Sequence, residues 1–321
     1  RGYEVPAWLV TFAEKFGLGG VILFDYDFQN KKYENNIRDQ AQIRALCNQL
    51  HALNSKPLIF IDQEGGRVRR LKESRGFQPL PSQWEMNKLQ DEEQLPILEN
   101  AFAEMKSIGI DVNLAPVVDL NINPENPDIG KVERSYSAQP ADVLRNVRIL
   151  NSVAKKHGIG LCLKHYPGLG GATVNSHYEL TDISDSVNDE QLHLFETLAR
   201  EINGNSILLS HGMVRQWDAQ FPASISPTIV GKLRHQSEDC LLLSDDMQMQ
   251  GLQKRMSTAD ACKQALLSGI DMICLGNNLL DQSDQMLGIA DSLANQLSEN
   301  PTLHRNCASA IARVQARKKL F

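Results

Sequence analysis

Short apolar runs alternate with longer amphipathic stretches along this chain, and that alternation is what most restricts its fold. A helix between two strands requires a parallel crossover, and continuously apolar strands have both faces covered. The sequence therefore predicts an α/β fold with a parallel sheet. The predicted strands are residues 19–24, 57–61, 110–118, 159–163, 207–210, 241–243 and 272–275. The predicted helices are residues 6–16, 39–53, 92–108, 140–157, 189–203, 229–235, 258–268 and 282–297.

Polar residues follow nearly every predicted strand, which favours a TIM (β/α)8-type barrel over an open doubly wound sheet. In a barrel the carboxyl ends of the strands form a ring, so polar groups placed there converge. Seven strands are visible, and residues 6–16 already read as a helix, so the first strand is expected to be missing or to lie before Arg1. No linker or repeat divides the chain, which predicts one domain over residues 1–321. The strand-end residues are Asp25, Asp62, Asp119, Lys164, His165, His211, Asp245 and Asn277.

Composition excludes several classes of partner. The chain has 321 residues, 42% of them hydrophobic, and a net charge of -6, so it can bury a large core and lacks a basic field for nucleic acid or anionic membranes. No apolar run approaches the roughly 20 residues that cross a bilayer, so no membrane span is expected. The six cysteines follow no zinc or redox spacing and are predicted to be buried free thiols. They favour a cytoplasmic location, while the abrupt start at Arg1 leaves a periplasmic or exported protein open.

Two adjacent carboxylates mark the strongest candidate for an active site. The apolar run 241–243 leads directly into Ser244, Asp245 and Asp246. Carboxylates at the carboxyl end of a parallel strand lie where barrel enzymes keep their chemistry. The alternative is that Ser244 or one of the acids caps the helix that follows, and both roles are compatible.

A glycine-rich loop carries the second candidate. Residues 167–171 lack the lysine of a phosphate-binding loop and the third glycine of a dinucleotide loop, so we interpret them as a mobile segment that brings His177 over the site. A carboxylate nucleophile facing a histidine acid/base is glycosidase-like chemistry. Lys164 and His165 are adjacent on a strand and point to opposite faces unless the strand end bends. Pro167 and Gly168 could supply that bend.

A metal site is not expected, and neither is another cofactor. Several potential ligands could converge at the strand ends, but no His-x-His or His-Glu-x-x-His pair fixes two of them on one element. The potential ligands are Asp62, Asp119, His165, His177, His211 and Asp245.

The chain resembles the catalytic barrel of glycoside hydrolase family 3, and within that family it is most similar to single-barrel bacterial β-N-acetylglucosaminidases. The resemblance covers nearly the whole chain. It rests on residues 19–24 (GGVILF), 62–70 (DQEGGRVRR), 113–119 (NLAPVVD), Ile129 and Gly130 with Arg134 to Tyr136, 164–170 (KHYPGLG), 175–177 (NSH) and 244–249 (SDDMQM).

The resemblance implies a role for each matched residue. Asp245 would be the nucleophile and His177 the acid/base on the loop. The family's barrel begins with a strand that would precede Arg1. The implied activity is retaining, exo-acting hydrolysis by a β-N-acetylhexosaminidase, which removes terminal N-acetylglucosamine from peptidoglycan-type fragments. The residues that match sugar-binding positions are Asp62, Arg70, Arg134, Lys164 and His165.

Three departures from the family pattern leave alternatives open. Asn175 stands where the single-barrel enzymes pair an aspartate with the histidine, and it supplies no charge. Leu169 replaces a usual histidine, and Lys131-Val132 is inserted before Arg134. A β-glucosidase, a glycoside phosphorylase of the same family and a sugar-binding protein that has lost catalysis are the alternatives. A carbohydrate is the expected partner, and the sequence does not indicate an oligomeric state.

Overall fold

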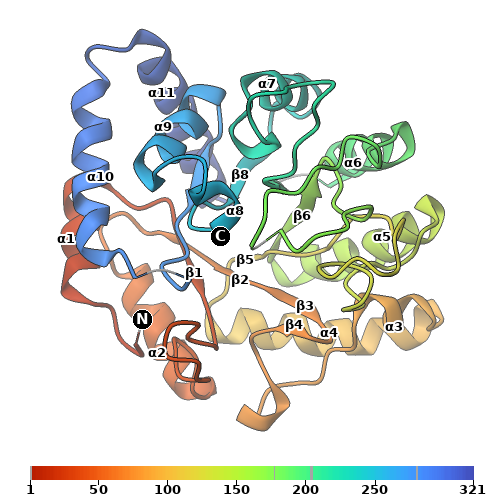
Figure 1. The fold of residues 1–321 in the computed structure, drawn as a ribbon. Coiled ribbons are helices and arrows are strands. Elements are labelled where there is room, and N and C mark those ends of the chain that lie inside the picture. The colour runs from red at the N-terminus through yellow and green to blue at the C-terminus, as the bar shows by residue number, and fades with distance from the viewer. Residues whose placement is uncertain (1, 177, 203–204, 280) are drawn as a thin grey trace.

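The computed structural model describes residues 2–176, 178–202, 205–279 and 281–321. Within them, seven parallel strands form one sheet in the order β1-β2-β5-β6-β7-β8-β9, and helices surround it (Figure 1). The barrel-type α/β fold is therefore confirmed. The strands are β1 Gly20–Leu23, β2 Leu58–Ile61, β5 Val112–Asn113, β6 Gly160–Tyr166, β7 Ser206–Leu209, β8 Leu241–Asp246 and β9 Met272–Cys274.

The longer helices occupy the predicted stretches, except that α11, Pro301–Lys318, was not predicted. The longer ones are α1 Ala7–Phe16, α2 Gln40–His51, α4 Asp91–Ile108, α5 Pro140–His157, α6 Asp189–Glu201, α7 Pro227–Gln236, α9 Thr258–Ser268, α10 Ser283–Gln296 and α11 Pro301–Lys318. The short elements were not predicted. They are the antiparallel pair β3 Gln63–Gly65 and β4 Val68–Arg69, helices α3 Gln83–Asn87 and α8 Gln250–Gln253, and the 3-10 turns η1 Glu73–Arg75 and η2 Ala223–Ile225.

Helix ends follow from their capping residues. The side chain of Asp39 accepts a hydrogen bond from Gln42 N at the start of α2, and Asn188 does the same for Gln191 N at the start of α6. Gly158 ends α5 in the left-handed conformation that glycine adopts without a steric penalty.

The strand predicted over residues 110–118 is shorter in the structure. Only Val112–Asn113 are paired as a strand, and Val117 forms an isolated bridge to Lys164. Pro116 has no N–H to donate to a sheet, which interrupts the ladder between the two paired parts. β1 and β9 are the end strands of the sheet, and a strand before Arg1 stays a prediction.

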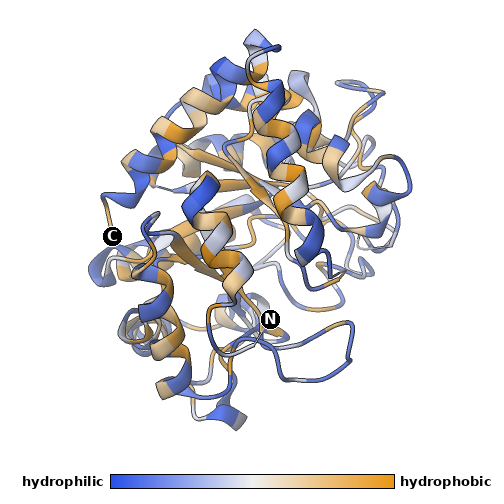
Figure 2. Ribbon diagram, turned by 90° about the vertical axis from the view of Figure 1, so that its left-hand side faces the viewer, coloured by the Kyte–Doolittle hydropathy of each residue, from blue (hydrophilic) through white to orange (hydrophobic). Residues whose placement is uncertain are grey.

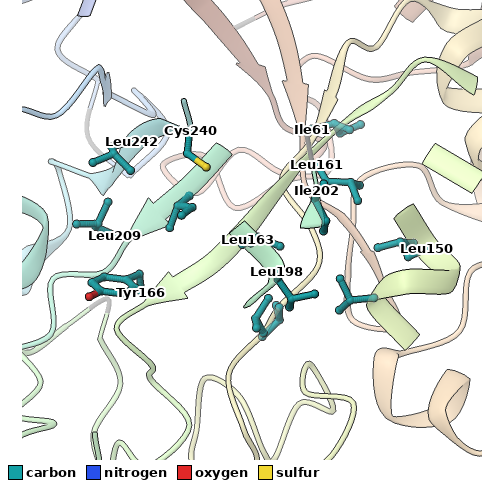
Figure 3. Close-up of a cluster of buried hydrophobic side chains, with 14 of the residues drawn as sticks. Ile61, Leu150, Leu161, Leu163, Tyr166, Leu198, Ile202, Leu209, Cys240 and Leu242 are labelled. Atoms are coloured by element: carbon teal, nitrogen blue, oxygen red, sulfur yellow. The ribbon is translucent and has the colours of Figure 1, made fainter. Parts of the chain in front are cut away.

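Strand alternation divides the core into two layers. On β2, Ile59 and Ile61 join the cluster that packs under the helices, whereas Leu58 and Phe60 join a second cluster on the other face of the sheet. Figure 3 shows the first cluster around β6, where side chains such as Leu161 and Leu163 lie near those of α6. Figure 2 shows that the strands inside the molecule are largely apolar, whereas the surrounding helices carry both polar and apolar residues.

The cysteines agree only in part with the prediction of buried free thiols. All six are free thiols, and Cys47, Cys162, Cys240 and Cys262 are buried, but Cys274 and Cys307 are only partly buried. The cytoplasmic location that they favoured stays a prediction. In the described part of the chain, every helix is too short or too polar to cross a bilayer.

The contact between β1 and β2 on the inner face gives a test of this packing. A Cβ atom added at Gly20 would overlap the ring of Phe60. We expect Gly20→Ala to lower the free energy of unfolding by about 1–3 kcal/mol, because overpacking outweighs the ~0.4–1 kcal/mol that alanine gains through the unfolded chain. Adding Phe60→Leu should recover part of that loss in a double-mutant cycle followed by urea denaturation. Purely additive effects would contradict this account of the contact.

Candidate active site

A buried cluster of opposite charges lies at the carboxyl ends of β2 and β6. Lys164 Nζ is 2.8 Å from Asp62 Oδ1 and 2.6 Å from Glu64 Oε1. Arg70 Nη2 lies 2.9 Å from Asp62 Oδ2 on its other side. Three predicted sugar-binding residues, Asp62, Arg70 and Lys164, are therefore in direct contact.

The cluster keeps its charges although it is buried. Burial favours the neutral form of Asp62, but Lys164 and Arg70 outweigh it and hold the pKa of Asp62 below its ordinary value. Burial likewise opposes ionisation of Glu64, yet Arg134 and Lys164 lower its pKa to about 2. Asp62 and Glu64 in turn raise the pKa of Lys164 against the effect of its own burial. Because each charge stabilises its neighbours, the cluster stays ionised at neutral pH.

Arg134 and His165 extend the cluster to Asp119. Arg134 forms a bidentate ion pair with Glu64, at 2.8 and 2.9 Å, and its Nη2 lies 3.1 Å from His165 Nε2. A guanidinium only donates, so His165 Nε2 must accept. The proton of the imidazole is then on Nδ1, which donates to Asp119 Oδ2 at 2.6 Å. His165 is therefore a neutral side chain with a fixed tautomer, and Arg134 is a buried partner of Glu64 rather than a surface arginine.

The end of β6 explains how two adjacent residues reach one cluster. The Lys164–His165 peptide bond is cis, and the pairing of β6 with β7 shifts between Lys164 and Tyr166. The shift in pairing shows that β6 is irregular between Lys164 and Tyr166, so the expected bend begins before Pro167 and Gly168. Lys164 continues the inner face that Cys162 occupies two residues earlier.

The β3–β4 hairpin places Arg70. Gln63 Oε1 accepts hydrogen bonds from Arg70 N at 2.9 Å and from Leu71 N at 3.0 Å, which fixes the backbone after β4. Gly65 has a φ of 106°, and a Cβ atom there would overlap the carbonyl of Pro81, so the turn requires glycine. Arg70 Nε is buried and has no hydrogen-bond partner among the described residues.

The paired acids at the end of β8 accept hydrogen bonds from backbone N–H groups but do not cap a helix. Asp246 N donates to Asp245 Oδ1 at 2.8 Å, which orients the Asp245 carboxylate. Asp246 Oδ1 accepts from Gln248 N at 3.0 Å and from Gly276 N at 3.1 Å, tying β8 to the segment after β9. The capping alternative was wrong, because α8 begins after Met249 with no side-chain cap.

Asp246 has an environment opposite to that of Asp62. Burial raises the pKa of Asp246 to about 6, its two backbone hydrogen bonds lower it, and the charge of Asp245 raises it again. Asp62, Asp245 and Asp246 also share a neighbour, the partly buried thiol of Cys274. Burial raises the pKa of Cys274, and the carboxylates of Asp246, Asp245 and Asp62 add to the effect. The paired acids and the charged cluster therefore belong to the same end of the sheet.

His211 stabilises the turn after the paired acids. Its Nε2 lies 2.9 Å from the carbonyl oxygen of Asp246, which can only accept, so Nε2 carries a proton. Its Nδ1 lies 2.6 Å from Ser224 Oγ. His211 thus holds backbone, and the described residues contain no group of three potential ligands that could bind a metal ion.

The predicted acid/base, His177, lies outside the described residues, but its flanking residues are anchored. Ser176 N donates to Asp128 Oδ2 at 2.7 Å, and Lys254 Nζ donates to the carbonyl of Tyr178 at 2.9 Å. The carbonyl oxygen of Asn175 accepts hydrogen bonds from Tyr178 N and from Glu179 N, which closes a turn. Movement of this loop stays a prediction.

The start of the same loop is packed against the segment after β5. Leu169 N donates to Asp119 Oδ1 at 2.7 Å, so Asp119 holds both Leu169 and His165. Leu169 is buried, and a Cβ atom added at Gly170 would overlap the carbonyl of Leu120. The leucine that departs from the family pattern is therefore a core residue here.

Two acidic residues of the site, Glu64 and Asp128, were not among the sequence candidates. Glu64 follows Asp62 by two residues, the spacing that places side chains on one face, and this signal could have identified it. Asp119 was expected at the strand ends and considered as a possible metal ligand, and Asp246 was noted as the neighbour of Asp245. Asp128 carries no sequence signal that separates it from ordinary acidic residues.

The pKa of Asp246 predicts a specific dependence of stability on pH. Between about pH 4 and pH 6 the folded protein binds more protons at this group than the unfolded chain, so its contribution to the free energy of unfolding falls as the pH rises. Relative to wild type, Asp246→Asn should therefore gain stability as the pH is raised from about 4 to 7, as measured by urea denaturation.

Asp182→Asn is the matched control for that measurement. Hydrogen bonds from Ser184 and Arg215 lower the pKa of Asp182 to about 2, so its contribution changes only at more acidic pH. A difference between Asp246→Asn and wild type that stayed constant over the same range would contradict the assigned environment of Asp246.

Comparisons with known proteins identify the family of this chain. The family description "Glycosyl hydrolase family 3 N terminal domain" matches residues 9–315. A beta-hexosaminidase of Bordetella avium is 30% identical over 300 residues, which cover 88% of this chain and 78% of the relative. A beta-N-acetylhexosaminidase from Beutenbergia cavernae superimposes with a TM-score of 0.85 at 22% identity, over 99% of this chain and 94% of that one. NagZ from Neisseria gonorrhoeae, solved in complex with N-trifluoroacetyl-D-glucosamine, gives a TM-score of 0.74 at 23% identity, over 98% and 90% of the two chains. The chain therefore belongs to glycosyl hydrolase family 3.

Proposed function

We propose that this glycoside hydrolase is a retaining, exo-acting β-N-acetylhexosaminidase that removes terminal N-acetylglucosamine from peptidoglycan-type fragments. The observation that carries the proposal is a buried, charged cluster at the same end of the sheet as the paired acids at positions 245 and 246. The relatives named beta-hexosaminidase support this choice of sugar.

The charged cluster suits the hydroxyl groups of a non-reducing sugar. In the proposed complex, Asp62 accepts hydrogen bonds from hydroxyls, while Lys164 and Arg70, whose Nε has no other partner among the described residues, donate to them. Arg134, through its ion pair with Glu64, and neutral His165, through its hydrogen bond to Asp119, complete the set. Charged partners that are already held in place lose little freedom when the sugar binds.

The proposed reaction proceeds in two steps. Asp245 attacks the anomeric carbon and His177 protonates the departing oxygen, which forms a glycosyl-enzyme. Neutral His177 then takes a proton from water, which releases the sugar with retained configuration. The amide of Asp246 holds one oxygen of Asp245 throughout. A histidine suits both steps because its ordinary pKa of about 6.5 lets it give and take a proton near neutrality.

Asp128 is our candidate for the negative charge that Asn175 lacks. Its carboxylate is buried and accepts the N–H of Ser176, the residue before His177. A carboxylate near an imidazole favours the protonated form. We therefore assign to Asp128 the role of a positioning residue that raises the pKa of the acid/base.

The nucleophile is tested by Asp245→Asn. We expect turnover of a nitrophenyl N-acetyl-β-glucosaminide to fall roughly a thousandfold or more, because no covalent intermediate forms. Asp291→Asn is the control, since this residue lies on α10 and pairs with Lys15. Unchanged turnover in Asp245→Asn would exclude the assignment.

The same assay separates the alternatives. The protein is assayed with a panel of nitrophenyl β-glycosides. Faster hydrolysis of the glucosides than of the N-acetylhexosaminides would identify a β-glucosidase. Sugar 1-phosphate formed in phosphate buffer would make the enzyme a phosphorylase. Glycan binding by the wild-type protein without any turnover would instead identify a sugar-binding protein.

The role of Asp128 is tested by the alkaline limb of the kcat/KM profile, which reports the pKa of the catalytic acid. Asp128→Asn removes a negative charge, so the pKa of His177 should fall and the limb should move to lower pH by about one unit. Asn175→Asp adds a charge and should move the limb to higher pH. If Asp128→Asn lowered the melting temperature but left the limb in place, its role would be structural only.

A further inference from the structure

Three aromatic side chains form a cluster on the loop between β1 and α2. The ring of Tyr26 contacts Phe28 and Tyr33, with centroid distances of 5.0 and 4.8 Å, and both contacts are edge-on. Phe28 remains 50% exposed and Tyr33 56% exposed. These rings therefore present their surfaces to solvent instead of filling the core, and exposed apolar surface that is gathered in one place commonly marks a binding site.

The backbone that carries the cluster is held by buried polar residues. The carbonyl of Tyr26 accepts hydrogen bonds from Asn35 Nδ2 at 3.2 Å and from Asn278 Nδ2 at 3.0 Å. Asn278 also accepts the N–H of Phe28 at 3.3 Å, and both asparagines are buried. The side chain of Asp27 accepts two backbone N–H groups in the turn between Phe28 and Tyr33. The rings are thus preorganised, which reduces the entropy that a ligand must overcome.

The aromatic cluster adjoins the charged cluster of Asp62, Arg70 and Lys164. The contact is made by residues that follow β1. Asp25, the residue before Tyr26, lies 3.9 Å from Arg70 Nη1 and 3.4 Å from Lys72 Nζ. Lys72 Nζ lies 5.2 Å from the ring centre of Tyr33, and Arg70 binds Asp62. The segment runs from β1 toward α2 in Figure 1. A chain of contacts therefore leads from the proposed sugar pocket to the exposed rings.

We propose that Tyr26, Phe28 and Tyr33 form a platform for the second sugar of an oligosaccharide substrate. This rests on the proposed function, in which the charged cluster holds the terminal sugar. The faces of a neutral pyranose carry C–H groups that pack on aromatic rings, and its hydroxyls lie at the edge. At the edge of this platform, the ammonium group of Lys72 is a polar partner for hydroxyls. The apolar faces and the polar edge together match a pyranose better than a purely apolar ligand.

The platform is tested with substrates that do and do not reach it. The methyl β-glycoside of N-acetylglucosamine has no second sugar, whereas a β-linked trimer of N-acetylglucosamine does. We expect Phe28→Ala combined with Tyr33→Ala to lower kcat/KM for the trimer roughly tenfold and to leave the methyl glycoside within about twofold of wild type. Because both rings are exposed, these variants should keep the melting temperature of the wild type.

Variants that keep the rings are the matched controls. Phe28→Tyr and Tyr33→Phe should hydrolyse the trimer at nearly the wild-type rate. An equal loss on both substrates, or no loss on either, overturns the platform. So does a change of oligomeric state in the alanine variants with unchanged kinetics, because the rings would then serve contact between protein copies.

A binding measurement distinguishes a wrong assignment of the platform from a wrong assignment of the proposed function. If the wild-type protein hydrolysed neither substrate, the proposed function would fail. Titration calorimetry with the trimer would still test the platform in that case, through wild type, the double alanine variant and the ring-retaining variants. Weaker binding in the alanine variant alone supports the platform, and equal binding in all of them overturns it.

Discussion

The ion pairs of Lys164 with Asp62 and Glu64 are the interaction on which the rest of the site depends. A lysine buried at the end of a strand is costly unless opposite charges and hydrogen bonds compensate it. Two carboxylates at 2.8 and 2.6 Å provide that compensation, and Arg70 and Arg134 neutralise their remaining charge. The result is a rigid set of charged groups that stays ionised without a ligand. Such a set can exchange hydrogen bonds with sugar hydroxyls without first being assembled.

The same alternation that builds the core builds the site. Cys162 and Lys164 lie on the inner face of β6, and the apolar layer ends where Lys164 begins. The β3–β4 hairpin then carries Arg70 to Asp62 through backbone bonds to Gln63. The floor of the site is therefore the hydrophobic layer inside the sheet, which excludes water from beneath the charged cluster and strengthens its ion pairs.

Much of the fold could be predicted because each strand and helix has its own local period. α5 and α9 begin and end at the predicted residues, with Pro140 and Ser257 at their starts and glycines at their ends. Contacts between distant segments could not be predicted in this way. The bond from Ser176 to Asp128 joins residues 48 positions apart, and no local pattern marks Asp128 as different from other acidic residues. Glu64 was within reach of the strand period, whereas the environment of Asp246 depends on burial that only the structure provides.

The contrast between Asp62 and Asp246 shows how one end of a sheet supports two kinds of carboxylate. Cations surround Asp62 and hold its pKa low, so it suits permanent hydrogen bonding to a neutral sugar. Asp246 is buried beside another carboxylate, its pKa is raised to about 6, and backbone N–H groups rather than cations hold it. The end of β8 is therefore the more electronegative of the two regions. In a retaining glycosidase, positive charge develops on the anomeric carbon in the transition state. On the proposed mechanism, the adjacent carboxylates at the end of β8 stabilise that charge more than they stabilise the neutral ground state, which is the condition for catalysis.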